Sequence, residues 1–110
     1  MAVDEKALEE LHSWWMAKAE EDFKSCAVKA LEYGSHDLSA MGLQLKGLIP
    51  IEQEATAQEL AVWLYAVGKI SRLQSDYAQG KPGKVDSWAD LVIYATMARR
   101  IQDVGGWPNE

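Results

Sequence analysis

The sequence has a single cysteine, three prolines and no run of about 18 consecutive apolar residues. The lone cysteine, Cys26, cannot form an internal disulfide, and it fits the reducing environment of the cytoplasm. Because a membrane-spanning helix needs a long apolar stretch, the sequence predicts no membrane partner. The charged first residues also lack the hydrophobic core of an export signal. We therefore expect a cytoplasmic protein.

Positive charge is also scarce. Acidic residues outnumber lysine and arginine by 17 to 11, which gives a net charge of −6. Because nucleic-acid binding needs a basic surface that displaces counterions, no nucleic-acid partner is expected. A free nucleotide needs only a local cationic or metal-bearing pocket, and this composition allows one. His12 and His36 lie near no second histidine or cysteine in the sequence, so a zinc site is not expected either.

Apolar residues at three- and four-residue steps predict long helices over residues 4–33, 56–78 and 86–103. No strand pattern is present, and 110 residues leave room for one core, so we expect a single helical domain over residues 1–110. The expected fold is all-α: an antiparallel bundle of these three main helices plus a short connector helix. The first helix is too long for one small partner, so it must pack along both later helices or against another subunit. Three helices with several tryptophans also leave apolar surface that 110 residues can hardly cover alone, so we expect a homodimer or a larger homo-oligomer.

Local signals indicate where these helices begin and end. Asp4 is a candidate N-cap, Thr56 and Glu59 have the spacing of a capping box, and Asp86 or Ser87 is the expected cap of the last helix. Gly34 is expected to end the first helix in a left-handed conformation, and Gly105-Gly106-Trp107-Pro108 to end the last one.

Three features of the middle of the chain suggest close packing or interruption. Gly42 is expected to interrupt the segment after the connector helix, and Pro50 to prevent a continuous helix through that segment. Gly68, inside the second long helix, suggests close approach of another backbone or of a ligand. The five tryptophans are more typical of a core or an oligomer interface than of ligand stacking, because each ring buries a large apolar area.

Two charged pairs form the only constellation that could carry chemistry. Lys69 and Arg72 share one helical face, and Asp86 and Asp90 share another. The aspartates could bind Mg²⁺, or Asp86 could be a helix cap and Asp90 a first-turn acid. The cations could contact a phosphate, or they could pair with Asp86 and Asp90 across the helices or with Asp76 on their own helix.

Three short motifs resemble a known family: Tyr33-Gly34, Gly-Lys-x-x-Arg from Gly68, and Asp-x-x-x-Asp-x-x-x-Tyr from Asp86. They resemble small phage-encoded members of the MazG-like all-α nucleotide pyrophosphohydrolase superfamily, in particular its nucleotide-modification-associated branch. The resemblance covers residues 33–34 and 59–101. It implies hydrolysis of nucleoside triphosphates to monophosphate and pyrophosphate, with Mg²⁺ held by Glu-x-x-Glu on one helix and Glu-x-x-Asp on the next.

The chain departs from that pattern at both metal motifs. Asp90 stands at the final aspartate, but Ser87 replaces the glutamate before it and Asp86 lies one residue further back. Lys69-x-x-Arg72 replaces the first pair of glutamates and reverses its charge. The resemblance therefore supports the fold better than the reaction.

These observations leave three functions open. The first is a Mg²⁺-dependent nucleotide pyrophosphohydrolase, with Asp86 and Asp90 on the metal, Lys69 and Arg72 on the phosphates, and Glu59 and Asp37 as candidates for the missing ligands. Its catalytic residues are not identified. The second is a nucleotide-binding relative without turnover. The third is a non-catalytic helical module, such as a phage protein that binds a host partner.

Overall fold

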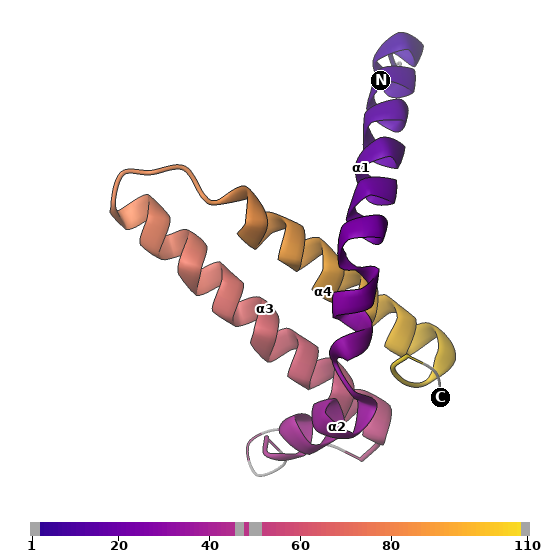
Figure 1. Ribbon diagram of the computed structural model, residues 1–110, viewed down its shortest axis with the longest axis vertical. Helices are drawn as coiled ribbons and strands as arrows, with labels where there is room; N and C mark the ends of the chain where they lie inside the picture. Colours follow the sequence, from indigo (N-terminus) through magenta and orange to yellow (C-terminus); the bar gives the residue numbers. More distant parts are fainter. Residues whose placement is uncertain (1–2, 46–47, 49–51, 109–110) are drawn as a thin grey trace.

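The computed structural model describes residues 3–45, 48 and 52–108. This part of the chain forms four helices: α1 (Glu5–Glu32), α2 (Ser35–Leu43), α3 (Glu54–Ala78) and α4 (Val85–Val104) (Figure 1). It contains no strand, so the all-α prediction is confirmed. None of the helices in the described residues is both long and apolar enough to cross a membrane. The expected effect of Pro50 lies outside the described residues.

The ends of α1 show one correct and one wrong prediction. Asp4 caps the helix, because its side chain accepts hydrogen bonds from the backbone N–H groups of Lys6 and Ala7 at 3.0 and 3.2 Å. Gly34, however, has a φ of −73° and is not left-handed. It is the N-cap of α2, so the chain passes directly from one helix into the next through extended backbone at Tyr33 and Gly34.

The predicted starts of the two later helices were wrong. The N-cap of α3 is Gln53, so Thr56 lies within the first turn and forms no capping box with Glu59. The N-cap of α4 is Lys84, which places Asp86 and Ser87 inside the helix. The predicted stop is confirmed: Gly105 is left-handed with a φ of 87°, and its N–H donates to the carbonyl of Ile101 at 2.8 Å.

The helices pack unevenly around one another. Helices α3 and α4 lie antiparallel and side by side, α2 packs against the first turns of α3, and α1 crosses α4 near its own C-terminal end (Figure 1). The rest of α1 projects away from the other helices. The prediction that this helix packs along both later helices within one chain was therefore wrong. The alternative, packing against another subunit, stays a prediction.

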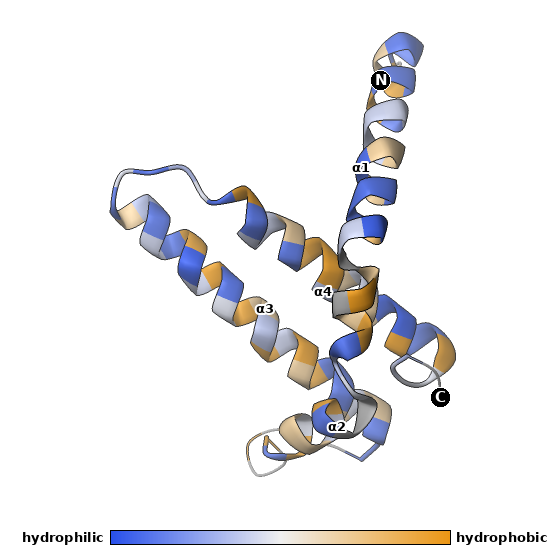
Figure 2. Ribbon diagram, viewed as in Figure 1, coloured by the Kyte–Doolittle hydropathy of each residue, from blue (hydrophilic) through white to orange (hydrophobic). Residues whose placement is uncertain are grey.

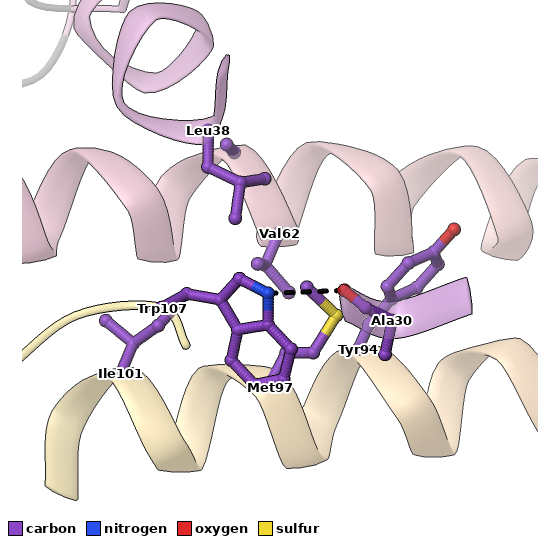
Figure 3. Close-up of a cluster of buried hydrophobic side chains, with 8 residues drawn as sticks. Ala30, Leu38, Val62, Tyr94, Met97, Ile101 and Trp107 are labelled. Carbon is purple, nitrogen blue, oxygen red and sulfur yellow. Dashed lines mark hydrogen bonds between the residues drawn. The ribbon is translucent and has the colours of Figure 1, made fainter. Parts of the chain in front are cut away.

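The core lies where the four helices and the C-terminal segment meet (Figure 3). Trp107 is only 7% exposed, whereas the other four tryptophans are at least half exposed. The expectation that tryptophans fill the core therefore holds within the chain for Trp107 alone. Its indole ring packs with buried side chains from every helix: Ala30, Leu38, Ala61, Val62, Tyr94, Met97 and Ile101.

A buried polar network joins the same elements. The backbone N–H of Trp107 donates to Gln58 Oε1 at 2.8 Å, and its indole Nε1 donates to the carbonyl of Ala30 at 3.2 Å (Figure 3). Gln58 Nε2 in turn donates to Ser39 Oγ at 3.1 Å, and Ser39 donates to Glu54 at 2.9 Å. Buried polar groups are costly unless they are hydrogen-bonded, so this network fixes the relative positions of α1, α2, α3 and the C-terminal segment.

Gly42 is where α2 approaches α3 most closely. It does not interrupt the helix as expected but lies within α2 and is buried. A Cβ atom at this position would lie 1.7 Å from the carbonyl oxygen of Ala57. Gly68, by contrast, is exposed, and none of the described residues has an atom within 4 Å of a Cβ built there. The close approach expected at Gly68 is therefore found at Gly42 instead.

Alanine substitutions at these two glycines should have opposite effects. Gly42→Ala should lower the free energy of unfolding by about 3 kcal/mol, because the methyl group meets backbone atoms that cannot move without separating α2 from α3. Gly68→Ala should raise it by about 0.5–1 kcal/mol, because alanine is the better helix former and meets no obstacle. Urea denaturation followed by circular dichroism measures both. Equal effects at the two sites would contradict the α2–α3 contact.

Candidate functional site

A polar cavity of about 500 Å³ lies between the second half of α3 and the first turns of α4. The loop that joins the two helices closes one side of it. The cavity brings together all four of the predicted site residues, Lys69, Arg72, Asp86 and Asp90. Its other lining residues are polar as well: Ser75, Asp76, Gln79, Lys81, Lys84 and Ser87.

Lys69 and Asp90 form an ion pair across the cavity. Lys69 Nζ lies 2.8 Å from Asp90 Oδ2, and the two side chains are 17% and 18% exposed. The pair links the middle of α3 to the second turn of α4. Because both side chains are mostly buried, their attraction is stronger than that of an exposed ion pair. Removal of one partner would leave the other charge buried and unneutralised, which would destabilise the fold. Of the alternatives that the sequence left open for Lys69, the structure therefore contains the pairing across the helices.

Arg72, Lys81 and Lys84 add further positive charge to the cavity wall. Arg72 lies one turn after Lys69, and within the described part of the chain it forms no ion pair. With Lys69, the wall carries four cations against three aspartates, Asp76, Asp86 and Asp90. The sequence reasoning missed Lys81 and Lys84 because both lie in the interhelical loop, where no helical spacing relates them to Lys69 and Arg72.

Asp76 holds that loop in place, a role that the sequence reasoning also missed. Its Oδ2 accepts a hydrogen bond from the backbone N–H of Lys84 at 3.1 Å, and its backbone carbonyl accepts one from Lys81 at 3.0 Å. The residue is buried. Both bonds draw the loop back onto α3 and so fix where the backbone of Lys81 and Lys84 lies. The sequence offered one sign of this role: Asp76 is an acidic residue in the last turns of the helix, about one turn after Arg72 and just before the loop that contains Gly80 and Gly83.

The N-terminus of α4 also opens onto the cavity. Lys84 is the N-cap and makes no capping hydrogen bond with its side chain. The N–H of Ser87 donates to the carbonyl of Lys84 at 3.1 Å, whereas those of Val85 and Asp86 have no hydrogen-bond partner among the described residues. The helix dipole gives this end a partial positive charge. Together with the four cations, this end of α4 favours an anion in the cavity.

Three tyrosines form a cluster one helical turn beyond the ion pair. Tyr65 precedes Lys69 on α3 by four residues, Tyr94 follows Asp90 on α4 by four, and Tyr33 comes from the end of α1. The rings of Tyr65 and Tyr94 stack with centroids 5.7 Å apart, and the hydroxyls of Tyr33 and Tyr94 are hydrogen-bonded at 2.9 Å. The cluster therefore separates the polar cavity from the apolar core.

The environment of Tyr94 keeps its hydroxyl neutral. Burial raises the pKa of Tyr94 far above its ordinary value, and the hydrogen bond with Tyr33 and the nearby charge of Asp90 raise it further. A phenol with so high a pKa remains protonated at any physiological pH. It can donate or accept a hydrogen bond at the edge of the cavity, but it cannot act as a general base there.

The donors around Asp86 and Asp90 fit Mg²⁺ poorly. One oxygen of Asp90 is held by the Lys69 ammonium group, which a metal ion would have to displace. Glu59 and Asp37 are not among the residues that line the cavity, and Glu59 instead accepts a hydrogen bond from Gln102. Among the described residues, no three His, Cys, Asp or Glu side chains are grouped closely enough to hold a metal. The magnesium site stays a prediction.

A double-mutant cycle should measure the coupling between Lys69 and Asp90. Lys69→Ala leaves the Asp90 carboxylate partly buried without its cation, and we expect a loss of about 2 kcal/mol in the free energy of unfolding. The double variant with Asp90→Ala should lose less than the sum of the two single losses, by about 1–2 kcal/mol. Denaturant unfolding at pH 7 gives all four values. Additive losses would contradict the ion pair.

Comparisons of the chain with models of protein families, with curated proteins and with solved structures found no match. The resemblance to the MazG-like superfamily therefore stays a hypothesis that rests on the short motifs around Tyr33, Lys69 and Asp90.

Proposed function

We propose that the cavity between α3 and α4 binds the phosphate groups of a nucleotide. The observation that carries this proposal is the charge of the cavity wall. Lys69, Arg72, Lys81 and Lys84 outnumber the three aspartates there, although the chain as a whole has a net charge of −6. On an acidic protein, such a local reversal of sign attracts anions to this one place.

The types and positions of the cations suit phosphate in particular. The guanidinium group of Arg72 can donate two parallel hydrogen bonds to a phosphate, and the lysines supply point charges around it. The first backbone N–H groups of α4 add donors that already point out of the helix end. A cavity of about 500 Å³ lies within the usual range for small-molecule sites. Its polar wall fits a charged ligand better than an apolar one.

The ion pair gives this site a simple way to respond to its ligand. In the structure, Asp90 neutralises Lys69. A phosphate oxygen that replaces the carboxylate would keep the ammonium group paired, and the ligand would bring more negative charge than the carboxylate it displaces. The proposal concerns binding. The hydrolysis implied by the family resemblance stays a prediction.

Removal of single cations should weaken nucleotide binding. We expect Arg72→Gln and Lys84→Gln each to raise the Kd for ATP about tenfold, because each removes a charge-assisted hydrogen bond. Isothermal titration calorimetry in low salt measures the affinities. Lys24→Gln is the matched control, because Lys24 pairs with Glu20 on the surface of α1, away from the cavity. A flat titration of the wild-type protein with the common nucleoside triphosphates would contradict the proposal.

Asp90→Asn separates the phosphate site from a metal site. If the cavity binds phosphate directly, this substitution frees Lys69 and removes a repelling charge, so we expect the affinity for ATP without Mg²⁺ to rise about threefold to tenfold. If Asp90 holds a catalytic metal, the same substitution should abolish Mg²⁺-dependent release of pyrophosphate and weaken binding. Titrations with and without Mg²⁺, together with a pyrophosphate assay, show whether Asp90→Asn raises or lowers the affinity for ATP and whether it abolishes pyrophosphate release.

A helical interaction module is the second candidate function. The observation that favours it is the projecting part of α1, where Trp14, Trp15 and Phe23 are all more than half exposed. Large apolar side chains that gather on an unpacked helix are typical of a surface that binds another protein. This surface lies apart from the cavity, so the two functions are compatible in one chain.

A further inference from the structure

One apolar face of α1 continues from the core into solvent. At the C-terminal end of the helix, Ala30 is buried in the core and Tyr33 packs against Tyr65 and Tyr94. The same face continues toward the N-terminus at three- and four-residue steps through Leu8, Leu11, Trp15, Ala19 and Phe23. Every one of these five residues is exposed. Figure 2 shows hydrophobic residues on this projecting part as well as where α1 crosses α4.

The size of this exposed face matches what one subunit contributes to a stable dimer. Leu8, Leu11, Trp15 and Phe23 are between 48% and 71% exposed. With about 150–250 Å² for each aromatic residue and somewhat less for the others, they leave roughly 500 Å² of apolar surface in water. A standard interface buries about 800 Å² per partner, of which roughly 60% is apolar, so about 500 Å² is the expected apolar share.

We propose that this face of α1 packs against the same face of α1 from a second copy of the chain, with the two helices antiparallel. The rest of the molecule lies at the C-terminal end of α1 (Figure 1). A parallel pair would bring both of these bodies to the same end, whereas an antiparallel pair keeps them at opposite ends. Each projecting N-terminal half then reaches the other copy where its α1 enters the core.

The charges on α1 favour the same orientation. The first turns carry four acidic residues and one lysine, a net charge of −3 over residues 4–10, whereas residues 18–32 carry four acidic residues and three lysines, a net charge of −1: Asp4, Glu5, Lys6, Glu9 and Glu10 against Lys18, Glu20, Glu21, Asp22, Lys24, Lys29 and Glu32. A parallel pair would align the two acidic ends and the two helix dipoles, which is unfavourable. An antiparallel pair instead places each acidic end beside the less acidic later part of the other helix, which reduces the repulsion. The large residues Leu11 and Trp15 also meet the small Ala19 more readily in this orientation.

Two neighbouring tryptophans test the proposed face against a matched control. Trp15 lies on it, whereas Trp14 is rotated by about 100° around the helix, and the two are exposed to the same degree, 62% and 60%. Sedimentation velocity should give a dimer for the wild type and for Trp14→Glu, but a monomer for Trp15→Glu. Because both residues are exposed in the single chain, circular dichroism should show a folded protein for each variant.

Three outcomes would overturn the proposal. The first is a monomeric wild type at about 50 µM, a concentration well above the Kd that an interface of this size supports. The second is a dimer that survives Trp15→Glu. The third is a dimer that Trp14→Glu dissociates as fully as Trp15→Glu does. In the first case the face would have to serve a different protein.

Spin labels test the orientation. With Cys26 replaced by serine, a cysteine at Lys6 can carry a label on the side of α1 opposite the proposed face. An antiparallel pair that crosses near Met16 should hold the two labels roughly 30 Å apart along the axis, from the 1.5 Å rise per residue. A parallel pair has no axial separation and should hold the same positions only about 15 Å apart, from the usual spacing of packed helices of about 10 Å plus the Cα radius of about 2.3 Å on each outer side, before the length of the labels is added. Electron–electron double resonance measures the distance, and the short value would overturn the antiparallel arrangement.

Discussion

The fold depends on the way Trp107 is held. Its backbone N–H is bonded to Gln58 on α3, its indole N–H to the carbonyl of Ala30 on α1, and its ring packs against Met97 and Ile101 on α4. One residue beyond the last helix thus fixes three helices, and Gln58 extends the network to α2 through Ser39. Because both donors of Trp107 are buried, any shift of these helices would leave polar groups without partners. The core is therefore well defined at this end of the α3–α4 pair.

The opposite end of the α3–α4 pair is held mainly by charged and polar groups. Beyond the tyrosine cluster, the residues that line the cavity between α3 and α4 are all polar or charged. This end is ordered by the Lys69–Asp90 ion pair and by the hydrogen bonds that Asp76 accepts from the N–H groups of Lys84 and Lys81. The buried side chain of Leu73 also lies against Gly83 of the loop. The cavity can be hydrophilic because the apolar packing that stabilises the fold is concentrated elsewhere. A site for a charged ligand can thus exist at one end of the helix pair without weakening the core at the other.

The sequence predicted what depends on local chemistry and missed what depends on packing. Helical periodicity gave the long helices, and the chemistry of Asp4 and Gly105 gave two of their ends. Helical spacing identified the two charged pairs, Lys69 with Arg72 and Asp86 with Asp90, and the structure places all four residues around one cavity. The roles of Trp107, Gly42 and Asp76 were missed, because each is set by a contact with a residue distant in the sequence or by the path of a loop. The periodicity of the sequence identified the apolar face of α1. Periodicity alone, however, cannot show whether that face packs against other helices of the same chain.

The ion pair at Lys69 shows why the charge of the whole wall matters more than any single residue in it. Asp86 and Asp90 alone would favour a cation, and Lys69 and Arg72 alone would favour an anion. Both pairs line the same cavity, so their charges largely cancel. The net charge of the wall is then set by the loop residues Lys81 and Lys84 and by the exposed N-terminus of α4. Each of these contributes positive potential. The loop is held by Asp76, whose own negative charge is turned toward the backbone N–H of Lys84. The path of a short loop thereby decides which sign of ligand the cavity attracts.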